Sequence, residues 1–282
     1  MTVTDTVVRR HTAAIVRTMV LVALALIVLV PILWMISTSF KTQLDASTST
    51  SWVPDPGTLE SYRPLAAWSG KTPVVRWFFN SVVTASVTTA LVVSTAALAA
   101  YALARFTFRG RGVVFTLVVA TLFLPGFVFL IPTYLISDSL GILDSLPALM
   151  LPPVGGAFGV FFLRQFFLGL PRELEEAARL DGASDVRIFR SVMLPLAQPA
   201  LSTIAVITFL ASWNDFLWPV YALTTTSTLT LPAGLPLLQS AYIANQPLIM
   251  AGAVIASAPA LLVFVLFQRR IIESVATAGL KG

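Results

Sequence analysis

Six long apolar stretches, separated by charged residues, constrain this chain more than any other feature of its sequence. They cover residues 18–40, 77–104, 112–137, 145–163, about 199–221 and about 248–267. Each reaches or approaches the roughly 20 apolar residues that a helix needs to cross the hydrocarbon core of a membrane. Membrane-spanning strands would instead show alternating segments of about ten residues. The pattern predicts an all-α polytopic membrane protein with six transmembrane helices.

The composition excludes a soluble or disordered chain and several kinds of site. Of the 282 residues, 57% are hydrophobic and 11% are charged, whereas an average globular chain is about 25% charged. The chain has no cysteine and one histidine, His11. Disulfides, zinc-thiolate sites and thiol nucleophiles are therefore excluded. A single histidine also excludes most histidine-based catalysis and metal binding.

The first apolar stretch follows three arginines, as the apolar part of a secretory signal peptide would. It is longer than the apolar part of such a peptide, and no small-residue cleavage site follows Trp34. We interpret it as a retained transmembrane helix.

The basic residues predict the orientation. Six spans place both termini on one side, and 14 of the 18 Lys and Arg residues lie in the two termini and in the loops on that side. The other four, Lys41, Arg63, Lys71 and Arg76, share one long loop on the opposite side. The positive-inside rule then places both termini in the cytoplasm.

The densest charge lies between the fourth and fifth apolar stretches, where nine of the residues 172–190 are charged. Pro171 and the glutamates after it suit the start of a helix. Gly182 suits a left-handed C-terminal cap, and Ser184 or Asp185 suits the start of a second helix that Pro195 ends. The segment is predicted to form two short helices joined by a tight turn.

Charge pattern alone fits a helix pair lying on the membrane surface equally well. The spacing of six residues is more specific, because it follows Glu-Ala-Ala-x3-Gly-x9-Ile-x-Leu-Pro, with Val192 at the Ile position. The segment resembles the EAA loop of the membrane subunits of ABC importers. The six matching residues are Glu176, Ala177, Ala178, Gly182, Leu194 and Pro195.

The resemblance covers nearly the whole chain and favours the carbohydrate-uptake branch, in particular the maltose-transporter G type of membrane subunit. Residues 176–184, 212–219 and the ending 268–282 carry it. It implies a type I ABC importer permease fold in three parts. These are a tail, first span and outer loop (1–76), a permease core of five spans containing the coupling loop 171–195 (77–268), and a cytoplasmic tail (269–282).

The resemblance also implies how the loop works. It would seat on a cytoplasmic ATPase and transmit that subunit's closure to the spans, with Glu176 and Asp181 making charge contacts. Ala177 and Ala178 would allow close approach, Gly182 would set the turn, and Leu194 and Pro195 would anchor the helices to the fifth span.

This family's chain would hold no cofactor, because ATP and Mg would bind to the partner ATPase, a dimer. Residues 70–72 resemble the end of a phosphate loop, but Leu65 stands where that loop needs glycine, so we expect no enzymatic activity. The other expected partners are a second permease subunit, an extracytoplasmic substrate-binding protein and membrane lipid, with no nucleic acid. The expected location is the cytoplasmic (inner) membrane of a bacterium or archaeon.

One carboxylate lies inside an apolar stretch, Asp215, next to Asn214. Ionisable residues within a membrane are candidates for function. Two interpretations stay open: an Asn-Asp pair satisfied by neighbouring helices, or a pair that faces the translocation path and bonds sugar hydroxyls. In the second, Trp213 or Trp218 would stack on a sugar ring.

The predicted function is the permease subunit of a binding-protein-dependent ABC importer for a sugar, such as a di- or oligosaccharide. The scarcity of basic residues within the apolar stretches favours a neutral solute over glycerol phosphate, which stays an alternative. A secondary transporter would show internal repeats, and none is evident; a non-transporting membrane anchor is a further alternative. The uncharged stretch 222–247 either folds back on the helices or contacts a binding protein.

Overall fold

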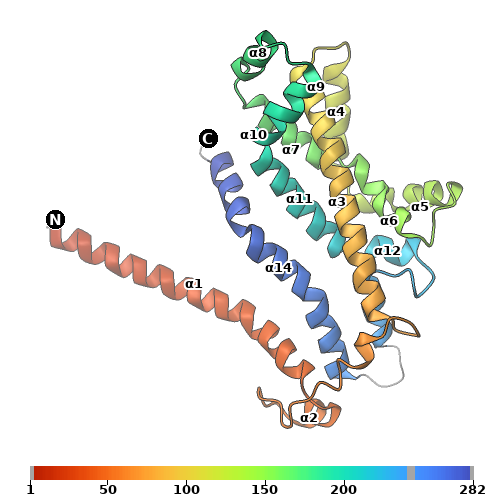
Figure 1. Cartoon of the computed structure of the whole chain (residues 1–282). Coiled ribbons are helices and arrows are strands. Elements are labelled where there is room, and N and C mark those ends of the chain that lie inside the picture. Colours follow the sequence, from red (N-terminus) through yellow and green to blue (C-terminus); the bar gives the residue numbers. More distant parts are fainter. Residues whose placement is uncertain (1–2, 240–244, 280–282) are drawn as a thin grey trace. The chain divides into compact units, whose positions relative to one another are not determined.

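The computed structural model describes residues 3–239 and 245–279, with side chains from 14 to 239 and from 245 to 268. Every regular element in these ranges is helical, as the sequence predicts (Figure 1). The chain divides into two units, Met1–Ala66 with Leu237–Ile255, and Ala67–Pro236 with Ala256–Gly282. Residues 280–282 of the expected C-terminal tail and residues 240–244 of the uncharged stretch lie outside the described residues.

The first unit contains a long helix that buries almost none of its side chains. Helix α1 (Val3–Ser39) has an apolar portion, Ala14–Ser39, with no residue buried in its most apolar window. Helix α2 (Gln43–Thr48) follows, and the Thr42 hydroxyl caps it by accepting the Asp45 N–H at 3.1 Å. The unit also holds η1 (Pro64–Ala66) and the first turns of α14 (Gln246–Gly279).

The second unit is organised around α3 (Val74–Arg105), which packs against α7 (Ala157–Leu168) and α11 (Gln198–Trp213). Small residues permit the close approach. A Cβ added to Gly159 of α7 would lie 3.0 Å from the Cβ of Ala96 in α3. Larger apolar side chains such as Leu163 and Phe167 fill the adjoining core.

The remaining elements of the second unit are shorter. In chain order they are α4 (Arg111–Thr121), η2 (Gly126–Phe129), α5 (Leu130–Ser139), α6 (Leu146–Met150), η3 (Pro152–Gly155), α8 (Glu173–Leu180), α9 (Asp185–Ile188), the π-helical turn η4 (Phe189–Met193), α10 (Leu194–Leu196), α12 (Leu217–Ala222), α13 (Leu231–Gly234) and η5 (Leu235–Leu238), whose last residues pass into the first unit.

Three of the six predicted spans are not single helices. Within the described residues, three helices are long and apolar enough to cross a membrane unbroken: Ala14–Ser39, Val74–Arg105 and Gln246–Gln268. The others are bent pairs, at 102° after Thr121, 44° before Ala157 and 75° before Gln198. Counting each pair as one span gives up to six. Proline and glycine interrupt the helical hydrogen bonds at the first two breaks, an effect that the apolar count ignores.

The fifth span also ends earlier than the sequence suggests. Helix α11 stops at Trp213, and a separate short helix, α12, holds the residues up to Ala222. Arg164, which the sequence places in a loop, belongs instead to α7. Its guanidinium carbon lies 3.8 Å from the centre of the Phe115 ring, and its Nε donates to the Leu103 carbonyl.

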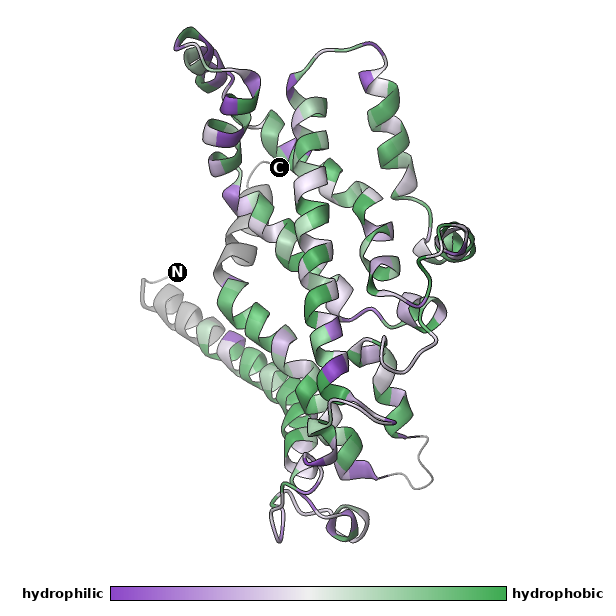
Figure 2. Ribbon diagram, turned by 45° about the vertical axis from the view of Figure 1, so that its right-hand side comes forward, coloured by the Kyte–Doolittle hydropathy of each residue, from purple (hydrophilic) through white to green (hydrophobic). Residues whose placement is uncertain are grey.

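Apolar side chains cover much of the outside of these helices, as a lipid-facing surface requires. In α4 and the turn after it, Val113, Leu117 and Phe123 are all strongly exposed. Figure 2 shows α3 and α11 as mainly hydrophobic, while hydrophilic residues gather in the segment 171–195 and in loops. A chain with this surface is stable only in an apolar solvent.

Candidate functional site

We call residues 171–195 the EAA segment. Its first helix, α8, begins at Glu173, so Pro171 precedes the helix and does not occupy its first position. The end of α8 follows the prediction: Gly182 has φ +80°, and its N–H bonds to the Arg179 carbonyl at 3.0 Å. The Ala183 N–H bonds to the Ala178 carbonyl at 3.0 Å. This pair of bonds is a Schellman motif, which fixes the turn.

The second half of the EAA segment is tied to the helical core. The Ser184 hydroxyl accepts the Arg187 N–H and caps α9, as one of the two predicted caps. The chain then makes the π-helical turn η4, and Leu194 packs against the core around α3 and α7. Helix α10 continues through Pro195 and ends at Leu196, one residue beyond the expected stop.

A buried ion pair attaches the EAA segment to α3, and the sequence alone did not predict it. The Arg105 Nε lies 2.6 Å from a Glu175 carboxylate oxygen, and the two side chains are 4% and 6% exposed. The Tyr101 hydroxyl donates to the other Glu175 oxygen at 3.3 Å, and Arg105 also donates to the Leu170 carbonyl at 2.8 Å. These bonds join the C-terminal end of α3 to the start of α8.

The same pair decides which face of α8 turns inward. Leu174, Ala177 and Ala178 fall at i, i+3 and i+4, which indicates a narrow apolar face, yet Leu174 and Ala177 are exposed. Glu175 and Ala178, three positions apart, turn inward instead. Arg105 directly follows the second apolar stretch on the predicted cytoplasmic side, which places it where it can pair with a glutamate of this segment. No local pattern indicates which glutamate pairs with it.

Several residues of the EAA segment stay free to meet another protein. Glu176, Ala177 and Asp181 are exposed, and Leu180 is 91% exposed. Leu180 ends α8, next to the charged residues Arg179 and Asp181. The EAA segment therefore exposes both charged side chains and apolar ones, with Leu180 the most exposed of the apolar ones.

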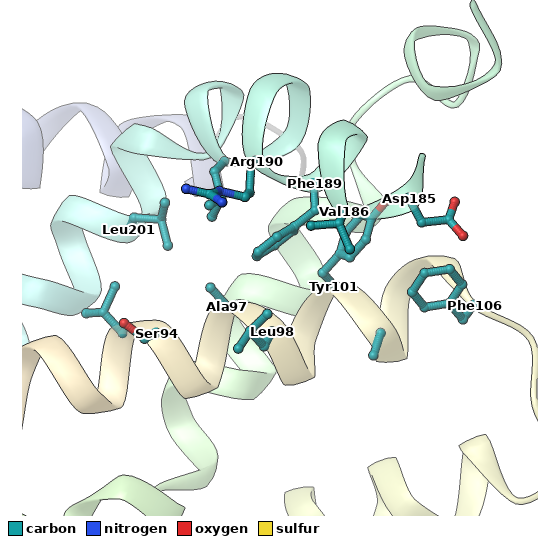
Figure 3. Close-up of a pocket in the computed structure, with 13 residues that line it drawn as sticks. Ser94, Ala97, Leu98, Tyr101, Phe106, Asp185, Val186, Phe189, Arg190 and Leu201 are labelled. Atoms are coloured by element: carbon teal, nitrogen blue, oxygen red, sulfur yellow. The ribbon is translucent and has the colours of Figure 1, made fainter. Parts of the chain in front are cut away.

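An apolar groove of about 730 Å³ runs between α3 and the α9–η4 turn (Figure 3). Phe189 and Tyr101 face each other in it, with ring centres 4.9 Å apart. The Asp185 carboxylate points away from the groove and pairs with Arg179 at 2.9 Å. The groove therefore offers apolar contacts and little hydrogen bonding, which does not suit a sugar.

The four candidates for the translocation path lie together where α11 ends and α12 begins, and three of them bond to backbone carbonyls. Trp213 is 1% exposed and donates to the Ala256 carbonyl at 3.0 Å. Trp218 donates to the Ala148 carbonyl at 2.9 Å, and the Asn214 amide donates to the Leu210 carbonyl within its own helix.

Asp215 differs from these three, because its carboxylate has no basic partner among the described residues. It accepts the Trp218 N–H at 3.3 Å and lines a small cavity.

The uncharged stretch after α12 folds back on the start of α3, one of the two outcomes that the sequence left open. We call residues 222–236 the Thr/Pro segment. The Trp77 Nε1 donates to the Thr226 carbonyl at 2.7 Å. Asn80 donates to the carbonyls of Ser227 and Leu229 at 3.0 and 2.8 Å. The Leu231 N–H donates to the Ser81 hydroxyl at 2.8 Å.

Asp144 holds the other side of the Thr/Pro segment. Its carboxylate accepts the N–H groups of Thr224 and Thr225 at 2.9 Å each and the Thr228 hydroxyl at 2.7 Å, and it also bonds the Thr225 hydroxyl. These hydrogen bonds, led by those from Thr225, lower the pKa of Asp144 well below its ordinary value. Asp144 adopts a left-handed backbone, φ 57°, which lets it face the segment.

Within the described residues, no group of three or more His, Cys, Asp or Glu side chains gathers as a metal site would. The second unit is a set of apolar, partly broken helices. The charged helix pair of the EAA segment lies at one end of α3 and is held by the Arg105–Glu175 pair. The uncharged Thr/Pro segment lies at the other end and is held by hydrogen bonds. A polytopic helical core that carries the EAA segment is the architecture that the sequence predicts for a membrane transport permease.

The comparison with protein families agrees with a membrane transport permease. The family described as "Binding-protein-dependent transport system inner membrane component" matches residues 93–276. This chain belongs to that family. It is a multi-pass permease component of the inner membrane, and ATP hydrolysis is the work of a separate subunit. The family has no cofactor of its own. Membership excludes a secondary transporter and a passive membrane anchor.

Similar proteins are carbohydrate permeases, as the sequence predicts. The chain is 36% identical to the arabinooligosaccharide permease AraQ of Bacillus subtilis over 76% of each chain. It is 37% identical to the diacetylchitobiose permease NgcG of Streptomyces coelicolor, covering 90% of this chain and 85% of NgcG. It is 30% identical to the galactooligosaccharide permease GanQ of Bacillus subtilis over 99% of each.

A solved structure supports the fold. A chain of a bacterial ABC transporter that imports the acidic polysaccharide alginate matches with a TM-score of 0.80, covering 95% of this chain and 98% of that one. The two sequences are 23% identical, so the match concerns the fold.

Proposed function

We propose that this chain forms half of the translocation path of an ABC importer for a neutral di- or oligosaccharide, beside a second permease subunit. The names of AraQ, NgcG and GanQ support this class of cargo, since all three are permeases for short sugars. Glycerol phosphate or another small solute is the alternative cargo. Binding of candidate sugars by the importer's binding protein distinguishes the two.

The observation that carries the coupling role is the geometry of the EAA segment. Its turn is fixed by the Schellman motif at Gly182, and its base is fixed by the Arg105–Glu175 pair. A rigid, exposed helix tied to a span is what transmission of an ATPase movement requires. The proposed coupling residues are Glu176, Ala177, Ala178, Asp181, Gly182, Leu194 and Pro195, to which the structure adds Leu180 as an apolar anchor.

The test replaces the glycine of the turn. We expect Gly182→Asp to lower both sugar uptake and co-purification of the ATPase dimer, because an aspartate strains the left-handed turn and adds a charge at the docking surface. Gly141→Asp is the matched control. Gly141 also has a left-handed φ, +64°, and open space around it, but it lies outside the EAA segment. Normal uptake by the Gly182 variant would contradict the coupling role.

We assign the translocation path to the end of α11, with Asn214 and Asp215 as hydrogen-bonding residues. Trp213 and Trp218 stay predicted stacking partners; Trp213 is 1% exposed, so stacking on a sugar requires one of its ring faces to be uncovered. We expect Asp215→Ala to lower uptake at limiting substrate. Uptake equal to that of the unchanged chain would remove Asp215 from the path.

The orientation follows from the same proposal. The EAA segment faces the cytoplasm, together with both termini, and the Thr/Pro segment and residues 41–76 face the substrate-binding protein. Arg105, Arg111 and Arg164 support this, because all three bond near the C-terminal end of α3, beside the EAA segment. The division into 1–76, 77–268 and 269–282 is part of the proposal.

The absence of cysteine makes the orientation easy to test. Single cysteines at the exposed residues Leu180 and Leu59 give unique labelling sites. A membrane-impermeant thiol reagent should label the Leu59 position in intact cells and the Leu180 position only after the membrane is opened. The reverse pattern would overturn the orientation.

A further inference from the structure

A small cavity, lined by both apolar and polar side chains, lies between α3, α6, η3, α11 and the segments that follow α11. Its volume is about 160 Å³. Its polar lining consists of the Asp215 carboxylate and five hydroxyl side chains: Thr84, Thr88, Thr208, Ser212 and Thr230. Neither Lys, Arg nor His is among the described residues that line it.

Three of these hydroxyls have no hydrogen-bond partner among the described residues. They belong to Thr84, Thr88 and Thr230, whose residues are 3%, 1% and 3% exposed. Buried polar atoms in folded proteins are nearly always paired. Three unpaired hydroxyls around one cavity therefore indicate that a polar ligand binds among them.

The charge of the cavity selects the kind of ligand. When ionised, Asp215 brings one negative charge, and no basic side chain among the described residues lines the cavity to balance it. A partly buried carboxylate without a partner favours a bound cation. The available donors are all oxygen atoms, which hard cations prefer, and a single carboxylate balances a charge of one. Sites for Ca²⁺ commonly use several carboxylates, and this cavity has one.

In the conformation described, the volume of the cavity is too small to hold a sugar. Pockets for organic ligands usually have volumes of about 300–1,000 Å³, well above this one. At about 30 Å³ for each water molecule, the cavity suits an ion with a few waters. We propose that it binds a monovalent cation of the size of Na⁺, held by Asp215 and the surrounding hydroxyls.

The ion links three parts of the second unit. Thr84 and Thr88 belong to α3, Thr208 and Ser212 belong to α11, and Thr230 belongs to the Thr/Pro segment. Its binding stabilises the packing of the Thr/Pro segment on the helices. The role does not depend on which solute the importer carries.

The test measures the melting temperature of the complete importer in lipid nanodiscs, in NaCl and in choline chloride of equal ionic strength. A ligand that binds only the folded state raises stability by mass action. With Na⁺ at tenfold excess over its Kd, we expect a higher melting temperature in NaCl than in choline chloride. Asp215→Asn and Thr88→Val should each abolish most of this rise.

Thr89→Val is the matched control, because Thr89 neighbours Thr88 on α3 but donates to the Ala85 carbonyl and does not line the cavity. It should keep the full response to Na⁺. Equal melting in Na⁺ and choline for the unchanged chain would overturn the proposal. So would a full response in Asp215→Asn. A loss of sugar uptake in Asp215→Ala with no Na⁺ effect in the unchanged chain would overturn it too, and would support the path role alone.

Discussion

The EAA segment and the Thr/Pro segment are attached to opposite ends of the same helix, α3, by different chemistry. The EAA segment is densely charged and is joined through one buried ion pair, Arg105–Glu175, while other charged groups stay exposed. The Thr/Pro segment has no charged residue and is held by neutral hydrogen bonds and by Asp144. One segment leaves most of its charged groups exposed, and the other uses many of its polar groups within the chain.

The ion pair supplies the largest expected effect. Glu175→Ala leaves the Arg105 guanidinium buried without its partner, and breaking a buried pair in this way costs about 3–5 kcal/mol. We expect a large fall in the melting temperature of the importer and loss of bound ATPase. Melting temperature and co-purification measure the two effects.

The double variant Arg105→Met with Glu175→Leu is the control for this prediction. It removes both charges, so it should recover much of the stability that the single variant loses. If Glu175→Ala alone melts like the unchanged chain, the EAA segment is not held by this pair. The contrast between the two segments would then rest on exposed charge alone.

Packing of the Thr/Pro segment gives the next effect. A Cβ added at Gly234 would overlap the Trp77 ring, so Gly234→Ala forces one of the two residues to move. Overpacking of this kind costs about 1–3 kcal/mol. We expect faster proteolysis of the Thr/Pro segment with the ATPase still bound, because the EAA segment lies at the other end of α3.

Gly126→Ala controls for the substitution itself, since nothing lies within 4 Å of the position where its Cβ would be. It should behave like the unchanged chain. Loss of ATPase binding in Gly234→Ala would show that the two ends of α3 are not independent.

The smallest effect concerns Asp144 and pH. Because its folded pKa is lowered, Asp144 contributes stability that is complete above its unfolded pKa, about 3.9, and is lost as pH falls through the folded value. We expect the amides of Thr224 and Thr225 to lose protection from hydrogen exchange under strong acid. Asp144→Asn keeps the left-handed backbone and should remove this pH dependence. An unchanged acid response in the Asp144→Asn variant would exclude the carboxylate as its cause.

Local signals explain what was predictable. The apolar stretches indicated membrane-spanning helices, because length and lack of charge are properties of each helix by itself. The Gly182 cap and the Ser184 cap were also predictable, since each depends on residues within one turn. The spacing of the EAA motif led to the right family for the same reason.

Other features depended on residues far apart in the chain. Which of three neighbouring glutamates turns inward was decided by Arg105, seventy positions earlier than Glu175. The sharp bends within the third, fourth and fifth spans did not follow from the count of apolar residues, which ignores the proline and glycine at the first two breaks.

The amino-acid sequence by itself thus determined that the chain spans a membrane, where its local turns lie and to which family it belongs. Only the tertiary structure decided the surroundings of Glu175, Asp144 and Asp215. The physical reason is that helix propensity and capping act over a few residues, whereas a buried charge or hydroxyl must find its partner wherever the packing of distant helices brings one.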